Sequence, residues 1–582
     1  MSDAVKRAEE FLMREGAFRL GELLTEAFHP KTRRLSQTAA VDLPAAIRLL
    51  QSVDDEIPPA MEKVLQQDAF GRLVDVFVEA LSAGKKIYFT GCGATGRLSI
   101  LLEAAWRRCW REIKKVSPEL GELEDRVFSV MAGGDFALIK SVEGYEDFPD
   151  FGRYQLRERG VGPGDVVVAI TEGGETPFVI GTAWEGLDAG AKVFFVYNNP
   201  TELLCRHVKR SQEVIEEPRI TKLDLTTGPM AITGSTRMQA TTAELFIVGS
   251  ALEIAMVRFL RKNMSPMDAE RLRLRDRRPD EYHRRLCELL GQLSSNEAVD
   301  MLAAATAFEE GIYRRHGLVT YVADEFLLDV LTDTTERSPT FMLPAFRKQD
   351  DNLSPRSWAF VKDPLRPTKE AWRELLQREP RGLEWGRDAY ERMNAPENLK
   401  SRPPRLDNAE IHKFMIGCEP DPSRTDAADS AMVVVGVGDE KHVIRTALER
   451  FGSQYKKTAA LIVGPTDAAG TPDETFRFPC TLADSPLRLW HHLAVKLVLN
   501  TLSTATMVRM DRVIGNAMVC LSPSNKKLID RGCRLIAQQT GCSYGRACIA
   551  LHEALEEVTS GQKQGKEVPS PVALAIERIQ SG

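Results

Sequence analysis

The chain has 582 residues, of which 43% are hydrophobic and 27% charged, and its formal net charge is −6. This length exceeds what one hydrophobic core usually holds, so two or three domains are expected. The composition excludes wholesale disorder, and the charge gives no reason to expect nucleic acid as the main partner. The sequence has no run of eighteen uncharged apolar residues, and its start is charged where a signal peptide would be apolar. We therefore expect a cytoplasmic protein with no membrane partner.

Residues 1 to about 80 carry apolar side chains at helical spacing and predict helices. From about residue 85 to 260, strands and helices alternate. Continuous apolar runs of this kind are typical of strands buried on both faces, so the pattern predicts a parallel sheet in a three-layer α/β domain. The strand candidates are KKIYFTG (85–91), VFSVMAGG (127–134), DVVVAI (165–170) and KVFFVYN (192–198).

Three loops rich in glycine and hydroxyl groups occur in this region. In a parallel sheet, ligands bind beyond the carboxyl ends of the strands, where loops meet helix N-termini. Each loop alone is most simply an N-cap, but three in one sheet favour one anion site, with phosphate as the expected guest. We expect the first helix to begin near Gly96. The candidate residues are Gly91, Gly93, Ala94 and Thr95 in GCGATGR (91–97), Gly173, Gly174 and Thr176 in TEGGETPF (171–178), and Ser235 and Thr236 in TGSTRMQATTAELF (233–246).

A second set of strand candidates follows, at LVTYVAD (318–324), KFMIG (413–417), AMVVVGVG (431–438) and AALIVG (459–464). The first of them ends in ADEFLLDVL and not in glycines, so this second α/β domain is expected to lack a phosphate cradle. Residues 363–408 are rich in proline and charge, which indicates an insertion. The tail from about residue 490 is helical. Lys496 lies in its apolar run and either snorkels to the surface or reaches an anion.

No metal or nucleotide cofactor is predicted. The ten cysteines and nine histidines are scattered, without a CxxC pair, and buried free thiols are the favoured interpretation. His491 and His492 are adjacent and so point to different faces of a helix, which disfavours a shared metal ion. The loop at 91–97 matches neither GxGxxG nor GxxxxGK[ST].

Taken together, these stretches resemble the sugar isomerase (SIS) domain family, and within it the N-acetylmuramic acid 6-phosphate etherases and their double-domain relatives, the glucokinase regulatory proteins. The resemblance implies two tandem, flavodoxin-like SIS domains that form a pseudo-dimer within one chain. It is carried by GCGATGRLSIL (91–101), MAGGDFALIKSVEGYED (131–147), DVVVAITEGGETPFVIG (165–181), TGSTRMQATTAE (233–244) and VKLVLNTLSTATMVRMDRVIGNAMVCLSPSNKKL (495–528).

The expected division is a helical segment at 1–80, SIS domain 1 with the phosphosugar site at 81–262, and a helical connection at 263–300. A degenerate SIS domain 2 follows at 301–510, with its insertion at about 363–408, and a small helical domain at 511–582. The middle of the chain, about 290–480, matches the family only in architecture. Whether two such chains associate further is left open.

The resemblance implies a phosphorylated sugar or amino sugar as the ligand of the first domain. Glu146 matches the etherase base that acts on the sugar's C2 proton, and etherase chemistry also requires an acid at the leaving oxygen. Lys496 matches a lysine that enters the site from the partner domain. The remaining positions carried over are Thr95, Ser235 and Thr236 as phosphate-binding hydroxyls, and Glu143 as the first glutamate of the VEGxED stretch.

The chain departs from the etherase pattern at the acid. Ala105 stands at the position of the acid glutamate, eight residues after the arginine of the loop. Glu103 is close in sequence, but two residues turn a helix by roughly 200°, so its side chain leaves from the opposite face. Glu103 is therefore a poor substitute.

Two other loops also depart. Gly173 stands where the family commonly has serine, Gln239 replaces a usual lysine, and Glu172 and Glu175 are additional carboxylates. A carboxylate beside a phosphate is electrostatically unfavourable unless it contacts the sugar or a cation. Either both carboxylates point to solvent, or Glu172 supplies a displaced acid.

Two functions follow from these features. The first is a tandem-SIS sensor that binds a hexose or amino-sugar phosphate and passes the ligand state to a protein partner such as a sugar kinase. The second is an etherase-like lyase with Glu146 as base. An aldose–ketose isomerase is disfavoured, because the second member of its acid–base pair cannot be assigned. The absent acid favours the sensor, since a general acid typically contributes 10²–10⁴-fold to rate.

Overall fold

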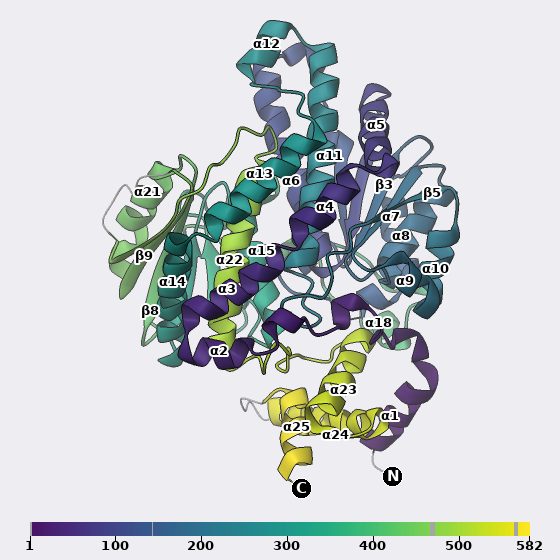
Figure 1. Ribbon diagram of the computed structural model, residues 1–582, viewed down its shortest axis with the longest axis vertical. Coiled ribbons are helices and arrows are strands. Elements are labelled where there is room, and N and C mark those ends of the chain that lie inside the picture. Colours follow the sequence, from purple (N-terminus) through teal and green to yellow (C-terminus); the bar gives the residue numbers. More distant parts are fainter. Residues whose placement is uncertain (1–2, 143, 466–471, 564–568, 582) are drawn as a thin grey trace.

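Two parallel sheets organise the computed structural model, which describes residues 3–142, 144–465, 472–563 and 569–581 (Figure 1). The strands of the first sheet are β1 (Ile87–Gly91), β2 (Val127–Met131), β3 (Val166–Thr171), β4 (Lys192–Tyr197) and β5 (Ile220–Asp224). They lie in the order β2-β1-β3-β4-β5. This is the flavodoxin-like order, whose switch point between β1 and β3 is where such sheets bind ligands.

The second sheet repeats this order. Its strands are β6 (Leu318–Val322), β7 (Ala359–Lys362), β8 (Ser430–Val437), β9 (Lys457–Val463) and β10 (Glu474–Phe478). They lie in the order β10-β9-β8-β6-β7, which is the order of the first sheet when each set is counted from its own first strand. The expected fold class of two tandem α/β domains is confirmed. We call the part built on the first sheet the first unit, and the part built on the second sheet the second unit.

Apolar side chains on both faces explain the central strands. Every residue of β1, β3, β6 and β8 is buried. In β8, Met432 and Val434 pack with α21 (Lys441–Phe451), whereas Val433 and Val435 belong to the larger core on the other face. This alternation is the period of a strand covered on both sides.

The edges of the sheets differ from the sequence prediction. The sequence does not predict β5, β7 or β10, which are all edge strands. Along β5 and β10, buried residues are interspersed with partly or fully exposed ones, and β7 has only four residues. None of the three strands therefore gives a long apolar run. The strand expected at 413–417 is wrong. Its apolar residues are buried because Phe414 packs edge to face on Phe136 of the first unit, with ring centroids 5.9 Å apart.

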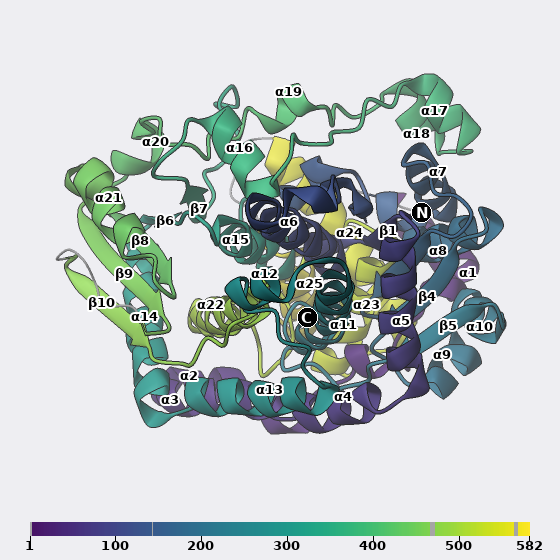
Figure 2. The same ribbon diagram turned by 90° about the horizontal axis from the view of Figure 1, so that it is seen from above.

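The units meet through long helices at the centre of the molecule (Figure 2). Of these, α6 (Gly93–Val116) follows β1, α15 (Leu327–Phe341) follows β6, and the two helices contact each other. The later helices α11 (Gln239–Asn263) and α22 (Leu489–Arg509) also contact each other. The other helices of the units are α7 (Pro149–Glu158), α8 (Pro177–Asp188), α9 (Thr201–His207), α10 (Lys209–Glu216), α12 (Pro266–Arg271), α13 (Pro279–Leu293) and α14 (Asn296–Arg314).

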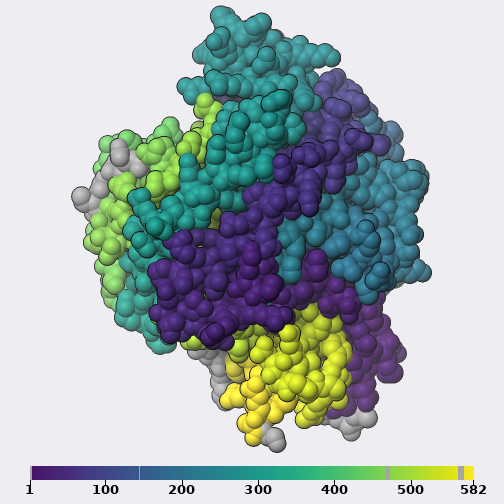
Figure 3. Space-filling model, in the orientation of Figure 1, coloured from purple at the N-terminus to yellow at the C-terminus, as the bar shows by residue number. Residues whose placement is uncertain are grey.

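The N-terminal helices cross from one unit to the other, and Figure 3 shows this segment lying over the face of the molecule. In it, α3 (Leu43–Asp54) contacts α14 of the second unit, and α4 (Ile57–Leu65) contacts α11 of the first. The first helix, α1 (Asp3–Arg14), instead packs against the C-terminal helices. The remaining helices of the two ends are α2 (Leu35–Val41), α5 (Asp68–Ser82), α23 (Lys526–Thr540), α24 (Tyr544–Lys563) and α25 (Pro571–Ser581).

The segment between β7 and β8 leaves the second unit and reaches the first (Figure 2). Its helices are α16 (Thr368–Leu376), α17 (Arg387–Arg392), α18 (Glu397–Ser401), α19 (Asn408–Ile411) and α20 (Pro422–Thr425). Arg378 of this segment pairs with Asp135 at 2.5 Å and with Glu103 at 3.1 Å. Because all three side chains are buried, the segment is bound to the first unit by charge as well as by apolar packing.

Candidate functional site

Cys92 alone connects the end of β1 to the start of α6. The helix begins at Gly93, three residues earlier than expected, so Thr95 lies in its first turn. The Thr95 hydroxyl accepts a hydrogen bond from the Cys92 N–H at 3.0 Å and donates one to the Cys92 carbonyl at 2.8 Å. This arrangement caps the helix start. The Thr95 hydroxyl is therefore engaged by the backbone of its own helix start, and its contact with a phosphate stays a prediction.

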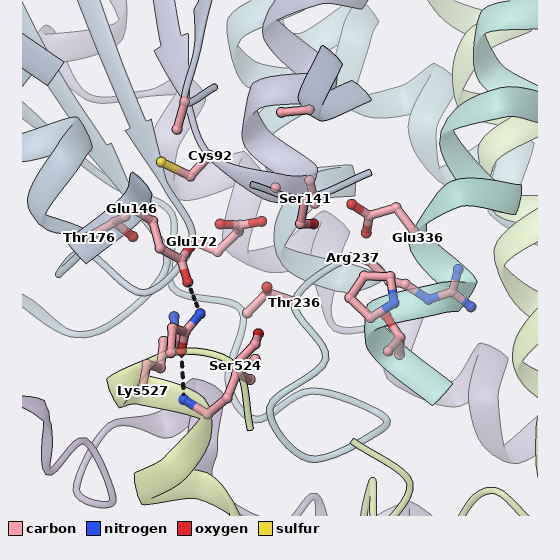
Figure 4. Close-up of a pocket in the computed structure, with 18 of the residues that line it drawn as sticks. Cys92, Ser141, Glu146, Glu172, Thr176, Thr236, Arg237, Glu336, Ser524 and Lys527 are labelled. Atoms are coloured by element: carbon pink, nitrogen blue, oxygen red, sulfur yellow. Dashed lines mark hydrogen bonds between the residues drawn. The ribbon is translucent and has the colours of Figure 1, made fainter. Parts of the chain in front are cut away.

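A cavity of about 210 Å³ lies at the carboxyl edge of the first sheet, and we call it the first cavity. It is lined by the loops after β1, β2 and β3, by residues 234–237 before α11, by α15 of the second unit and by residues 518–531 (Figure 4). Seven of the predicted site residues line it: Gly93, Ala94, Glu146, Glu172, Thr176, Ser235 and Thr236. The three predicted loops therefore come together. Glu143 lies outside the described residues.

Gly173 and Gly174 shape the second loop without lining the first cavity. The Gly173 carbonyl accepts from Asn199 Nδ2 at 3.0 Å, and the Gly174 carbonyl accepts from Ser211 Oγ at 2.7 Å. Gly174 has a φ of +71°, and a Cβ there would lie 2.5 Å from Leu204 Cδ1. Only glycine fits this position without strain. The pair turns the chain so that Glu172 and Thr176 reach the cavity from either side.

Lys496 does not line the first cavity. Its Nζ donates to the carbonyls of Arg237 at 2.9 Å and Met238 at 3.1 Å, and to Thr242 Oγ1 and Asn500 Oδ1 at 2.8 Å each. Burial lowers the pKa of Lys496 to about 8. Lys496 thus supports the backbone next to Ser235 and Thr236, and its contact with an anion stays a prediction.

Two glutamates enter the first cavity from the first unit (Figure 4). Burial raises the pKa of Glu146, while Lys527 opposes this effect, and Asn525 Nδ2 donates to its carboxylate. Burial raises the pKa of Glu172 to about 7, so this side chain exchanges its proton near neutral pH. The alternative that Glu172 and Glu175 both point to solvent is wrong, because Glu172 lines the cavity and Glu175 is only 2% exposed.

The glutamate loop after β2 is held by the segment between β7 and β8. Tyr145, which precedes Glu146, hydrogen-bonds Tyr390 through the two hydroxyl groups. Its ring also stacks on Trp385, with centroids 6.1 Å apart and ring planes within 5°. The second unit therefore fixes the backbone from which Glu146 projects.

A lysine from the C-terminal helices closes the first cavity. Lys527, in the first turn of α23, pairs with Glu175 at 2.7 Å. Glu175 raises the pKa of Lys527 despite its burial, so the amine is held in its charged form. Arg531 also lines the cavity and fixes α23 through Glu26, at 2.6 Å. The sequence prediction missed both residues, although an asparagine N-cap followed by two lysines (NKK, 525–527) marks a basic helix start.

The second unit contributes a carboxylate wall. Glu336 of α15 lines the first cavity and pairs with Arg97 at 2.8 Å, and Arg237 pairs with Asp333 of the same helix at 3.1 Å. Both arginines are buried, which lowers their pKa. The sequence prediction missed Arg97, Arg237 and Glu336. Glu336 reaches the first cavity from the other unit, and no local sequence motif predicts such a contact.

Neither Ala105 nor Glu103 of α6 lines the first cavity. Ala105 faces a different cavity on the far side of this helix. Glu103 is 1% exposed and accepts from Arg107 at 2.9 Å, Arg381 at 2.9 Å and Ser129 Oγ at 2.6 Å. Its carboxylate therefore belongs to a buried ion cluster away from the first cavity.

Among the described residues, no group of three His, Cys, Asp or Glu side chains is placed to hold a metal ion.

Comparisons with known proteins agree with this architecture. Residues 71–185 match the model of the glucokinase regulatory protein N-terminal SIS domain. An N-acetylmuramic acid 6-phosphate etherase from Mesorhizobium japonicum is 32% identical over 228 residues, which cover 39% of this chain and 67% of the relative. The chain belongs to the SIS domain family. The resemblance seen in the sequence is thus confirmed.

A second etherase and one solved structure were also found to be similar to parts of this chain. The N-acetylmuramic acid 6-phosphate etherase of Rubrobacter xylanophilus is 29% identical over 287 residues, covering 49% of this SIS protein and 85% of the relative. The C-terminal domain of glucosamine-fructose-6-phosphate aminotransferase from Francisella tularensis aligns at 11% identity with a TM-score of 0.42, over 80% of this chain and 96% of that chain. Within the described ranges of this SIS protein, no helix has both the length and the apolar character needed to span a membrane.

Proposed function

We propose that the protein binds a phosphorylated sugar or amino sugar in the first cavity and acts as a sensor of that ligand. The observation that carries this proposal is the meeting, in one cavity, of the start of α6, the Ser235 and Thr236 loop and Lys527. Backbone N–H groups at a helix start, hydroxyl groups and a lysine are the donors that phosphate esters require. The etherase relatives are named for a phosphorylated sugar, which supports this ligand class.

The proposed contacts divide between the two ends of the ligand. Gly93 and Ala94 of α6, with the Ser235 and Thr236 hydroxyls and Lys527, would hold the phosphate. The carboxylates of Glu146 and Glu172 would then accept hydrogen bonds from sugar hydroxyls, since carboxylates beside the phosphate would repel it. Thr95, Gly173, Gly174 and Lys496 support these groups from behind.

The sensor reading is supported by the wall that the second unit contributes. A ligand at the start of α6 and at the 234–237 loop would lie beside Arg97 and Arg237, which pair with Glu336 and Asp333 of α15. The tandem chain would thus act as its own pseudo-dimer, with both units in contact with one ligand. A sugar kinase is the proposed class of partner. Ligand-dependent co-elution of the protein with such a kinase would test this step, and co-elution that is unchanged by phosphosugars would count against it.

A lyase of the etherase type is the second candidate, and one observation favours it. Glu172 lines the same cavity as Glu146, and its pKa of about 7 suits a general acid at neutral pH. In such a reaction, Glu146 would take the C2 proton, the ether carbon–oxygen bond would break, and Glu172 would protonate the departing oxygen. Water would then add to the resulting double bond.

One experiment separates the two candidates. The purified protein is incubated with N-acetylmuramic acid 6-phosphate, and lactate release is followed beside thermal-shift binding of a panel of sugar phosphates. The sensor proposal expects stabilisation without turnover, because a ligand that binds only the folded state raises its melting temperature. Lactate release that is lost in Glu146→Gln and in Glu172→Gln would establish the lyase instead.

A further inference from the structure

A second cavity, of about 560 Å³, lies on the far side of α6 at the carboxyl edge of the second sheet. Its lining includes Asp324 and Glu325, which lie in the loop between β6 and α15. Carboxyl edges near the first strand are the binding edges of sheets with this strand order. The second cavity therefore occupies the place at which the second unit would bind a ligand of its own.

The two cavities are built from corresponding segments. Each uses the loop after the first strand of its sheet and the residues that precede the long helix, at 234–237 for the first cavity and 486–488 for the second. Each also borrows a wall from the other unit: α15 supplies Glu336 to the first cavity, and α6 supplies Ala105 and Arg108 to the second. The segment that follows the other unit's long helix completes each lining, at 518–531 and 272–274. The second cavity is thus the pseudo-symmetric counterpart of the first.

The chemistry of the two linings differs at the helix start. In the first cavity, Gly93 and Ala94 leave the first turn of α6 open, whereas Asp324 and Glu325 stand just before α15. Carboxylates at this place repel a phosphate from the helix start. Asp324 is moreover paired with Arg366 of the segment after β7, at 2.7 Å. A phosphate is therefore excluded from the position that it would take in the first unit.

Glu325 and the arginines beside it in the second cavity are already paired with one another. Glu325 pairs with Arg108 at 3.1 Å and with Arg488 at 2.9 Å, and Arg108 also pairs with Glu374 at 3.3 Å. An incoming ion would have to compete with these pairs. Hydroxyl groups, in contrast, can donate to the carboxylates and accept from the guanidinium groups without breaking the pairs.

We propose that the second cavity binds an uncharged sugar. Its hydroxyl groups would bridge Glu325, Arg108 and Arg488, and its C–H faces would pack on apolar side chains of the same lining, including Leu328 and Leu487. The volume exceeds that of the first cavity, so a disaccharide is accommodated as well as a monosaccharide. This inference does not depend on the ligand of the first cavity.

The test uses the full chain with glucose, N-acetylglucosamine and the β-1,4-linked disaccharide of N-acetylglucosamine, beside the 6-phosphates of the two monosaccharides. Thermal shift and titration calorimetry measure binding. Ala105→Phe places a ring in the second cavity, and Ala303→Phe on α14 is its matched control, because both alanines are partly buried helix residues. We expect at least one uncharged sugar to bind, and Ala105→Phe to weaken it by at least about tenfold.

Ala303→Phe should leave binding of the uncharged sugar unchanged, and both variants should keep their response to the 6-phosphates. If Ala105→Phe fails to fold, Glu325→Gln takes its place and should also weaken the uncharged sugar by at least about tenfold, because it removes the carboxylate shared by two arginines. The proposal is overturned if none of the three uncharged sugars binds, or if Ala105→Phe and Glu325→Gln bind them as the wild type does. The proposal is also overturned if Ala105→Phe loses its response to the 6-phosphates while its binding of the uncharged sugars is unchanged. The second cavity would then hold the charged ligand.

Discussion

The two units share a strand order and differ at the carboxyl ends of their first strands. β1 is followed by Cys92 and Gly93, and β6 by Asp324 and Glu325 shortly before α15. The third residue of the following helix is Thr95 in α6 and Asp329 in α15. Thr95 caps its own helix, whereas Asp329 pairs with His492 at 3.0 Å. The comparison teaches that the sheet sets where a cavity forms, and that a few loop residues set which ligand it admits.

The largest expected effect concerns the segment that only the second unit carries. Arg378 is 7% exposed in its side chain and neutralises Asp135 and Glu103 of the first unit. Arg378→Met removes one partner from a buried ion cluster, which typically costs about 3–5 kcal/mol. We expect the free energy of unfolding, measured by urea denaturation, to fall by this amount. Arg373→Met is the matched control, because Arg373 pairs with Glu379 in solvent.

Exposed ion pairs contribute about 0–1 kcal/mol, so Arg373→Met should change the free energy of unfolding little. Equal losses in the two variants would mean that the segment is not bound to the first unit through Arg378. The segment between β7 and β8 would then be an insertion of the second unit that does not stabilise the first.

The next effect tests the cation that closes the first cavity. Lys527→Met should weaken the binding of a sugar 6-phosphate by about 2–3 kcal/mol, since hydrogen bonds to charged groups contribute about 1.5–3 kcal/mol. Lys526→Met is the control in the neighbouring position, because Lys526 pairs with Glu15 outside the cavity lining. Titration calorimetry measures both affinities. If both variants bind as the wild type does, Lys527 is a structural partner of Glu175 and does not hold the ligand.

Sequence reasoning found the parts of this comparison that depend on local pattern. The central strands are continuous apolar runs, so they could be predicted, and the loops after them followed from the direction of the strands. Edge strands such as β5 and β10 mix buried residues with partly or fully exposed ones and gave no such run. Lys527 and Glu336 reach the first cavity from helices that follow the first unit by many residues. Their placement depends on how the units pack, which no local pattern encodes.

A smaller effect is the pH dependence that Glu172 gives to binding. Burial raises the pKa of Glu172 to about 7, so its carboxyl is neutral below this pH and charged above it. A charged carboxylate disfavours an anionic ligand, and affinity should therefore fall as pH rises from 6 to 8. Glu172→Gln removes this ionisation. The ratio of the variant's affinity to that of the wild type should therefore rise by up to about tenfold from pH 6 to pH 8. The ratio cancels the titration of the ligand's own phosphate.

Calorimetry at the two pH values provides the measurement. Glu202→Gln, an exposed change in the same unit, is the control and should give a ratio that does not depend on pH. A constant ratio for Glu172→Gln as well would show that Glu172 does not face the ligand. The lyase candidate, which needs Glu172 as its acid, would lose its support at the same time.

The smallest expected effect concerns Thr95, whose position in α6 corresponds to Asp329 in α15. Its hydroxyl is engaged by the Cys92 backbone and does not reach the first cavity. Thr95→Val should therefore lower the free energy of unfolding by about 1 kcal/mol, as the loss of a helix cap does, and leave the affinity for sugar phosphates unchanged. Thr95→Ser keeps the hydroxyl and should restore most of the stability. If Thr95→Val instead loses affinity and Thr95→Ser restores it, the Thr95 hydroxyl contacts the ligand. In the bound state it would then exchange its hydrogen bonds with the Cys92 backbone for a phosphate contact.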